Sequence, residues 1–328
     1  METKFTKDNI DKLDKVDKFD KEFKSGFASL IGRPNVGKST LMNHLVGEKI
    51  AIVTNRPQTT RNKITSILTQ ESCQIVFIDT PGLHQPKTKL GDFMVTSAKN
   101  ALSGVDLVLY LVEPTAKVPP GDIAILAMLP QGSQVILVIN KADTVKKPEI
   151  LLTIDAYSKA EKKFDFLEVI PISALTGENT GALLEAIEKY LEPGPKYFPD
   201  DMITDQPERQ IAAEMIREKA LTFLQEEIPH GIAVEIVSMK ARKRNRQKAD
   251  KGDMVDLDAT IYCERDSHKA IVIGKGGVML KKIGQAARHD IERLLGSSIN
   301  LQLWVKVRKR WRDNDFILRD LGYDVKRI

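Results

Sequence analysis

The sequence predicts an α/β protein in which a larger domain, with a mostly parallel sheet flanked by helices, precedes a smaller α/β domain. Between residues 26 and 191, short apolar runs alternate with helical patterns, an order typical of right-handed βαβ units. Residues 192–207 hold four of the fifteen prolines of the chain, and a different order of elements follows them. We therefore expect a linker there and a second fold after it.

The first domain is expected to contain six strands. Several of them are continuous Val, Ile and Leu runs, as is typical of parallel strands that are buried on both faces. The expected strands are residues 27–31, 63–69, 74–78, 107–112, 135–139 and 168–172. Helical patterns are expected between them at residues 38–45, 93–102, 123–128 and 181–190.

The second domain is expected to have the order α-β-β-α-β. Its helices are predicted at residues 208–225 and 279–295, and its strands at 233–238, 256–263 and 300–307. This order does not repeat that of the first domain. We therefore divide the chain into a charged extension (1–24), a first domain (25–192), a linker (193–207) and a second domain (208–328).

The charge of the chain is concentrated in its second half. The net charge is +5, with +7 in residues 207–328 and −2 in the first 206 residues. A basic domain beside a nearly neutral one favours a polyanionic partner. No apolar run approaches the roughly 18 residues that a membrane span needs, so we expect no spanning helix.

The start of the chain has neither the apolar core of a signal peptide nor an Arg-rich transit segment, because residues 4–24 mix Lys and Asp almost evenly. We therefore expect a cytoplasmic protein. An amphipathic helix and a disordered tail both fit this segment. Peripheral membrane association is the minority interpretation, since its charges nearly cancel. Cys73 and Cys263 lie in apolar alternating runs, which favours two buried thiols over a disulfide or a metal site.

The strongest motif is residues 32–39 (GRPNVGKS), which match G-x-x-x-x-G-K-[ST] between an apolar run and a helical pattern. The glycines let the backbone wrap a phosphate, and the helix that follows directs its amides toward that charge. Lys38 would reach the outer phosphates and Ser39 would offer its hydroxyl to Mg²⁺. An ordinary glycine-rich turn is the alternative, but the lysine, the hydroxyl and the preceding strand argue against it.

Three further segments each follow an apolar run in the same way: residues 79–82 (DTPG), 140–143 (NKAD) and 173–175 (SAL). Asp79 would lie at the carboxyl edge of the sheet beside the phosphate loop, where it can hold Mg²⁺ through water. Each segment alone is also a common turn sequence. Four segments in this order, each ending a strand, strongly indicate a nucleotide site.

These four segments resemble those of the translation-factor class of GTPases, in which the N-K-x-D segment reads guanine. The resemblance implies that Asp143 accepts two hydrogen bonds from guanine, while Asn140 and Lys141 brace the loop and the base. Adenine would leave the buried carboxylate unpaired, which favours GTP and GDP over adenine nucleotides. The residues expected at the nucleotide are Gly32, Arg33, Pro34, Asn35, Val36, Gly37, Lys38, Ser39, Thr40, Asp79, Thr80, Pro81, Gly82, Asn140, Lys141, Asp143, Ser173, Ala174 and Leu175.

The segment PQTTR at residues 57–61, after GRPNVGKS, resembles the Era family of bacterial ribosome-assembly GTPases. The family pattern implies that Thr60 completes the Mg²⁺ site with Ser39 and Asp79, with Thr59 as the alternative ligand. Leu83 stands where Ras-like enzymes have a water-orienting glutamine. The resemblance further implies that K⁺ bound by Asn35 supplies catalytic positive charge, so Lys38, Thr60 and Asn35 are the catalytic candidates. The alternative for Asn35 is that it only shapes the loop.

The second domain contains IVIGKGG at residues 271–277, followed by a helical apolar pattern. This segment resembles the G-x-x-G loop of KH domains, and the element order resembles their type II topology. The resemblance implies that RNA approaches Gly274, Lys275, Gly276 and Gly277, with phosphate at Lys275 and about four unpaired bases in the adjoining groove. A tight turn is the alternative for an isolated G-x-x-G segment.

A basic loop at residues 240–251 holds seven Lys or Arg residues in twelve positions. We expect its residues Lys240, Arg242, Lys243 and Arg244 to contact RNA phosphates, with a solvated basic hairpin as the alternative. The long loop and the charged extension depart from the family pattern.

The resemblance covers both domains and implies a monomeric GTPase that binds 16S ribosomal RNA and assists assembly of the small ribosomal subunit. The alternative is a signalling GTPase whose second domain binds a protein or a membrane. A non-enzymatic RNA-binding protein is disfavoured because Lys38, Ser39, Asp79 and Asp143 are all present.

Overall fold

The computed structural model describes residues 22–54, 56, 59–82, 88–160, 165–225, 228–242 and 254–323. Most of the charged N-terminal extension, and with it the choice between a helix and a tail, lies outside these residues. The same holds for Pro57, Gln58, Leu83, Lys243 and Arg244.

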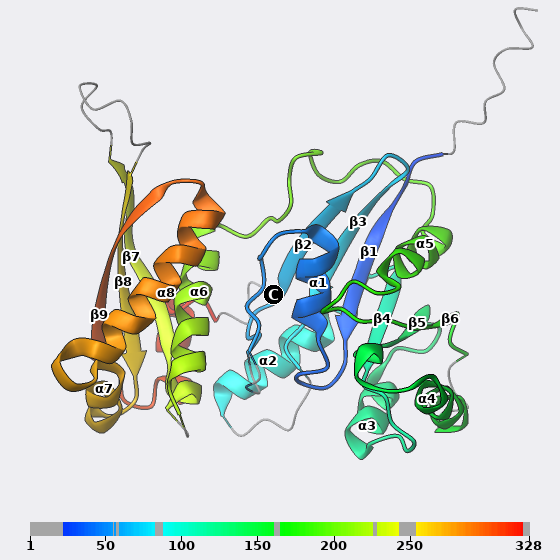
Figure 1. The fold of residues 1–328 in the computed structure, drawn as a ribbon, viewed down its shortest axis with the longest axis horizontal. Coiled ribbons are helices and arrows are strands. Elements are labelled where there is room, and N and C mark those ends of the chain that lie inside the picture. The colour runs from blue at the N-terminus through cyan, green and yellow to red at the C-terminus, as the bar shows by residue number, and fades with distance from the viewer. Residues whose placement is uncertain are drawn as a thin grey trace, which may run out of the picture.

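A six-stranded sheet in the order β2-β3-β1-β4-β5-β6 forms the centre of the first domain (Figure 1). Only β2 runs antiparallel to its neighbour β3, which confirms the predicted mostly parallel sheet. Every residue of β3 and β4 is buried, as expected of central strands. The strands are β1 Lys24–Ile31, β2 Ile64–Thr69, β3 Cys73–Asp79, β4 Leu107–Val112, β5 Val135–Ile139 and β6 Glu168–Pro171.

Five helices flank this sheet: α1 Lys38–Val46, α2 Lys89–Asn100, α3 Pro120–Met128, α4 Lys147–Ala160 and α5 Thr180–Tyr190. The sequence pattern did not predict α4. The reason is that α4 buries only Thr153 and Tyr157, whereas Leu151 and Leu152 are exposed. Its apolar residues therefore do not mark the face that packs on the sheet.

The second domain is built on a three-stranded sheet in the order β7-β8-β9, with α6 and α8 on the face that looks toward the first domain (Figure 1). β8 pairs antiparallel with β7 and parallel with β9. Helix α7 was not predicted. It ends at Ile273, in the segment between β8 and α8 where only a glycine-rich turn was expected. The elements are α6 Glu208–Phe223, β7 Ala233–Arg242, β8 Met254–Cys263, α7 Asp266–Ile273, α8 Val278–Leu295, β9 Ser298–Val307 and α9 Asp315–Asp320.

The proline-rich segment between the domains follows the edge of the six-stranded sheet. The Ile67 amide donates to the Ile203 carbonyl at 2.9 Å, and the Thr204 hydroxyl donates to the Thr65 carbonyl at 2.6 Å. A short antiparallel bridge also joins Lys24 and Pro193. The exact domain bounds given above stay a prediction.

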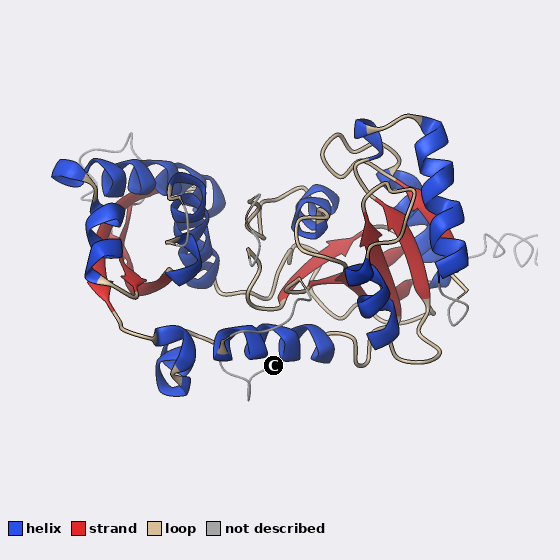
Figure 2. Ribbon diagram, turned by 90° about the horizontal axis from the view of Figure 1, so that it is seen from below, coloured by secondary structure: helices blue, strands red, loops and turns tan. Residues whose placement is uncertain are grey.

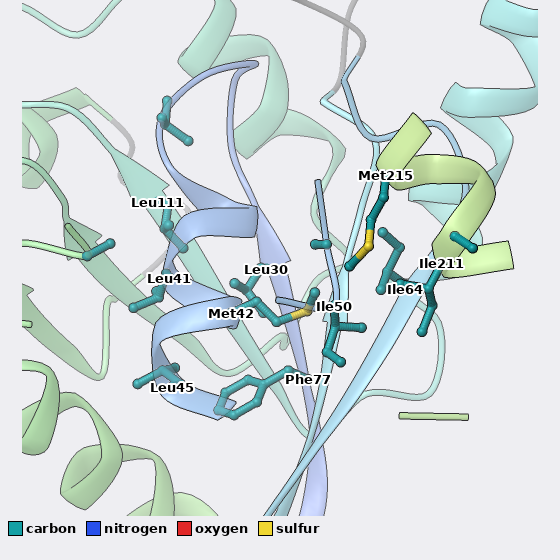
Figure 3. Packing of buried hydrophobic residues seen from close by; sticks show 14 of the residues in the cluster. Leu30, Leu41, Met42, Leu45, Ile50, Ile64, Phe77, Leu111, Ile211 and Met215 are labelled. Atoms are coloured by element: carbon teal, nitrogen blue, oxygen red, sulfur yellow. The ribbon is translucent and has the colours of Figure 1, made fainter. Parts of the chain in front are cut away.

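The apolar core is continuous between the two domains. Figure 3 shows Ile211 and Met215 of α6 beside Ile50 and Ile64 of the first domain, and all four side chains belong to one buried cluster. A second cluster joins Phe93 of α2 to residues near the C-terminal end, including Trp311 and Tyr323. Figures 1 and 2 show the connection between α1 and β2 in the space between α1 and the second domain.

Cys73 and Cys263 are both fully buried and unbonded to other sulfur, which confirms the prediction of two buried thiols. Across the described residues, no helix is long and apolar enough to cross a membrane.

Candidate functional site

The phosphate-loop segment, residues 32–39, joins β1 to α1, and its two glycines fit where no side chain could. A Cβ atom on Gly32 would lie 2.3 Å from the Leu111 carbonyl oxygen, and one on Gly37 would lie 2.1 Å from Asn140 Nδ2. Gly37 also has a φ of +100° as the residue before α1. The loop therefore turns tightly enough to direct the first amides of α1 into the concave side of the loop.

Lys38 is buried inside this loop, with 6% of its surface exposed. Its Nζ atom donates to the carbonyl oxygens of Gly32 and Arg33, both at 3.1 Å. Burial lowers the pKa of Lys38, and the nearby Asp79 carboxylate opposes that shift. The ammonium group is thus fixed above the loop, where it can exchange its carbonyl partners for anionic oxygens.

Three oxygen-bearing side chains converge beside the loop. Ser39 Oγ donates to Asp79 Oδ2 at 2.5 Å, and Thr60 Oγ1 lies 3.1 Å from Ser39 Oγ and 3.3 Å from Asp79 Oδ2. Asp79 is fully buried, its Oδ1 atom has no hydrogen-bond partner among the described residues, and burial raises its pKa despite the opposing charge of Lys38. A hard oxygen set with one unsatisfied carboxylate oxygen suits Mg²⁺.

Thr59 does not join this group of oxygens. Its hydroxyl donates to the Arg56 carbonyl at 2.6 Å and lies 2.7 Å from the Thr54 hydroxyl. The geometry therefore favours Thr60 over Thr59 as the ligand of a metal at this position.

Asn140 connects two of the predicted loops. Its Nδ2 atom donates to the Val36 carbonyl at 2.7 Å, and its Oδ1 atom accepts from the Ala174 amide at 2.9 Å. Asn140 is 2% exposed, so both bonds are shielded from water. The residue fixes the 173–175 loop against the phosphate loop and leaves Asp143 and Leu175 exposed at the open side.

Most of the predicted nucleotide residues line one cavity of about 320 Å³. Those at its surface are Pro34, Asn35, Gly37, Lys38, Ser39, Thr40, Thr60, Gly82, Asn140, Lys141, Asp143, Ala174 and Leu175. Behind this surface, the Thr80 hydroxyl donates to the Leu30 carbonyl, and Ser173 Oγ accepts from the Thr176 amide. Ile52, Val53 and Thr54 also line the cavity and carried no motif that could have identified them.

Two acidic residues that the sequence did not single out brace the site. The buried Asp122 carboxylate accepts from Arg33 Nε at 2.9 Å, from the Tyr110 hydroxyl at 2.9 Å and from the Tyr157 hydroxyl at 2.8 Å. Glu113 forms an ion pair with Lys141. Arg33, which belongs to the phosphate loop, is therefore tied to Asp122, and Lys141, which lines the cavity, is tied to Glu113.

The glycine loop of the second domain is open at Gly276 and Gly277, whereas a Cβ atom on Gly274 would lie 2.8 Å from Met279 Cβ. Gly274, Gly276 and Gly277 have φ values of +74°, +61° and +80°, and Gly277 directly precedes α8. A Cβ atom on Gly276 or Gly277 would meet nothing within 4 Å. Lys275 is exposed between Gly274 and Gly276, and a groove of about 360 Å³ runs on from Gly277 along α8 and β9.

The expected basic loop begins within the sheet, because β7 extends to Arg242. Lys240 is exposed on this strand, whereas the Arg242 guanidinium forms an ion pair with Asp256, with Nε at 2.7 Å from Oδ2. Asp256 also accepts from Asn300 Nδ2 at 2.8 Å. The charge of Arg242 is thus partly neutralised within the domain.

Comparison with known proteins gives two family matches. Residues 27–141 match the family described as 50S ribosome-binding GTPase, and residues 227–312 match the KH domain family. The chain is 56% identical over 305 residues to GTPase Era of Clostridioides difficile, covering 93% of this chain and 100% of that protein. It is 55% identical over 302 residues to GTPase Era of Clostridium tetani, covering 92% and 99%.

Two solved structures resemble the whole chain. Era in complex with MgGDPNP and nucleotides 1506–1542 of 16S ribosomal RNA matches with a TM-score of 0.86 and 39% identity, covering 92% of this chain and 99% of that one. Aquifex aeolicus Era bound to GDP·AlF₄⁻ matches with a TM-score of 0.85 and 39% identity, covering 92% and 100%.

Proposed function

This chain belongs to the Era family of GTPases, and we propose that it couples GTP binding and hydrolysis to binding of 16S ribosomal RNA during assembly of the small ribosomal subunit. The observation that carries the nucleotide part is the meeting of Lys38, the Ser39–Thr60–Asp79 oxygens and Asn140 around one cavity. These groups come from four loops that lie far apart in the sequence, and no packing requirement explains a buried lysine above a loop of carbonyls.

In this proposal the phosphates occupy the concave side of residues 32–39. The amides at the start of α1 donate to them, and Lys38 leaves the Gly32 and Arg33 carbonyls to contact the outer phosphates. The ammonium would then stabilise charge that develops during phosphoryl transfer. Until then the two carbonyl oxygens and the nearby Asp79 carboxylate compensate the burial of Lys38.

Ser39 and Thr60 would hold Mg²⁺ through their hydroxyls, and Asp79 would hold it through water. Related Era was solved with MgGDPNP. Bound Mg²⁺ neutralises the charge of the outer phosphates. The hydrogen bonds that join Ser39, Thr60 and Asp79 support this assignment, because they hold the three oxygen-bearing side chains at one position.

Guanine would lie between Asp143 and the 173–175 loop. Asp143 is exposed at the cavity rim, where its carboxylate can accept from the ring and amino N–H groups of the base. Ala174, whose amide donates to Asn140 Oδ1, lines the same cavity. Adenine would offer Asp143 no matching donors.

Asn35 would bind K⁺ beside the phosphates. It lines the cavity and has a left-handed φ of +67°. K⁺ there would add positive charge beside the outer phosphates.

The RNA would bind at the open glycine loop and along the groove between α8 and β9. In the related complex the partner is a 16S ribosomal RNA segment. The free space at Gly276 and Gly277 admits a nucleic-acid backbone, while Lys275, Lys281 and Arg288 are exposed near it. Since ribosomes are cytoplasmic, we place the protein there. Its monomeric state and any peripheral membrane association stay predictions.

The test is nucleotide selectivity. We expect hydrolysis of GTP and no hydrolysis of ATP, and we expect Asp143→Asn to prefer xanthosine triphosphate, because the amide exchanges an acceptor for a donor. Steady-state hydrolysis of the three nucleotides by both proteins measures this. Equal turnover of ATP and GTP by the unmodified protein would contradict the proposal.

A further inference from the structure

The two residues on either side of Thr60 in the sequence are both bonded to the second domain. The Thr59 carbonyl accepts a hydrogen bond from Arg217 Nη2 of α6. The Arg61 side chain is 1% exposed and donates to carbonyl oxygens of the second domain. Thr60 itself faces Asp79 and Ser39 in the first domain.

Arg217 is fixed in place by its own helix. Its side chain is fully buried, and its Nε atom donates to Glu214 Oε1 at 2.8 Å while its Nη2 atom also contacts Glu214 Oε2. A buried charge needs such a partner. The pairing with Glu214 ties the guanidinium to α6, so the Thr59 carbonyl is held against that helix.

Arg61 is held by carbonyls and by a ring. Its Nη1 atom donates to the Ile232 carbonyl at 2.7 Å and its Nη2 atom to the His230 carbonyl at 3.1 Å. The guanidinium carbon lies 5.5 Å from the centre of the Trp311 ring, whose Nε1 donates to the Gly231 carbonyl at 2.9 Å. A cation over a desolvated tryptophan adds to the hydrogen bonds.

Further contacts fix the same connection closer to α1. Glu218 Oε1 accepts from the Val53 amide at 2.9 Å, and Glu218 Oε2 lies 2.5 Å from Lys49 Nζ. Lys49 also lies 2.8 Å from Asp290 of α8. The connection between α1 and β2 is thus held by both helices that cover the three-stranded sheet.

We propose that Arg217 and Arg61 are positioning residues for GTP hydrolysis, which hold the backbone on both sides of Thr60 so that its hydroxyl reaches the metal position only while the second domain is docked. This inference rests on the proposed role of Thr60 as a Mg²⁺ ligand.

The same contacts would let RNA binding affect the nucleotide site. The helix that borders the RNA groove, α8, carries Asp290, so RNA that shifts α8 also shifts Lys49 and the α1–β2 connection.

The test compares Arg217→Ala with Arg209→Ala. Arg209 lies on the same helix but donates to the Ile236 carbonyl within the second domain. For Arg217→Ala we expect single-turnover GTP hydrolysis to slow by roughly 10- to 100-fold, because a charge-assisted hydrogen bond is lost. We expect the Mg²⁺ concentration for half-maximal binding of a GTP analogue to rise at least about fivefold, with GDP affinity and RNA affinity unchanged. Arg209→Ala should match the unmodified protein in all four measurements.

Hydrogen exchange of the Val53 amide gives a readout that does not depend on activity, and it should quicken in Arg217→Ala alone. Arg217→Lys keeps the charge and should recover part of the Mg²⁺ affinity. If the alanine protein does not fold, judged by circular dichroism, Arg217→Gln decides the outcome in its place.

Thr60→Ala separates this inference from the function it rests on. A defect in Thr60→Ala beside unchanged hydrolysis, Mg²⁺ dependence and amide exchange in the Arg217 variants would overturn the positioning role alone. Unchanged Mg²⁺ dependence in Thr60→Ala would overturn the metal role of Thr60 and the inference together.

Discussion

The chain has two glycine loops that each precede a long helix, and they are built in opposite ways. In the first domain, Gly37 precedes α1 and a side chain there would collide with Asn140 Nδ2 at 2.1 Å. In the second domain, Gly277 precedes α8 and a side chain there would meet nothing within 4 Å. A collision inside the protein excludes a side chain at Gly37 and, in the second loop, at Gly274, where a Cβ atom would lie 2.8 Å from Met279 Cβ. At Gly276 and Gly277 only the left-handed backbone favours glycine, and the space above them is free for a ligand.

The phosphate loop of the first domain therefore forms a preorganised site, whereas the glycine loop of the second domain forms an exposed one. Around the first loop, Lys38, Asn140 and Asp79 are buried, and the side chain of each forms a hydrogen bond with a residue of the phosphate loop. Around the second, Lys275 is exposed and the groove is open to solvent. A small ligand with fixed charges suits the first arrangement, and a flexible polyanion suits the second.

The largest effect is expected at the closed loop. Gly37→Ala should lower GTP and GDP affinity more than about a hundredfold, because roughly 1–2 kcal/mol of left-handed strain adds to displacement of a buried, twice-bonded asparagine. Gly47→Ala is the matched control, since Gly47 ends the same helix at a φ of +79° with nothing within 4 Å of a Cβ. Calorimetric titration with GDP measures both. Equal losses in the two variants would show that strain alone matters.

The second effect concerns the open loop. Gly277→Asp should weaken RNA binding roughly 10- to 100-fold, because it places a negative charge where phosphate lies, while GTP affinity stays unchanged. Gly296→Asp carries the same charge at the other end of α8, at a φ of +60°. RNA binding that survives in a folded Gly277→Asp protein would contradict the KH interpretation.

A third prediction concerns the rim of the closed site. GTP hydrolysis should be at least about tenfold faster in potassium than in sodium, and Asn35→Ala should abolish that difference while largely sparing nucleotide affinity. Stopped-flow phosphate release in matched chloride salts measures it. Identical rates in the two salts would leave a partner-supplied group as the better account.

The smallest effect distinguishes two cations on β7. Lys240→Gln should flatten the slope of log RNA affinity against log salt by roughly 0.7, the value for one contact on a single strand. Arg242→Gln should flatten it less, because Arg242 already pairs with Asp256. A salt series with both variants gives the two slopes. Equal slopes for Lys240→Gln and the unmodified protein would make this strand a solvated basic surface.

The sequence predicted the parts of the molecule that local pattern controls. Strands β4 and β5 fall on the expected residues, and the motifs lie at the strand ends as their spacing implied. Helices α4 and α7 were missed because neither presents a regular apolar face. Asp122, Glu113 and Arg217 were missed for a different reason. Each acts through a partner distant in sequence, and a single acidic or basic residue carries no local signal for such a contact.

The most direct test of the whole account is crosslinking of the protein to RNA in cells, followed by sequencing of the RNA and identification of the crosslinked peptides. We expect RNA reads concentrated in 16S ribosomal RNA and crosslinks in the peptides that contain residues 274–285. Both should be lost in Gly277→Asp but not in Gly296→Asp. Reads spread evenly over cellular RNA, or crosslinks confined to the first domain, would contradict it.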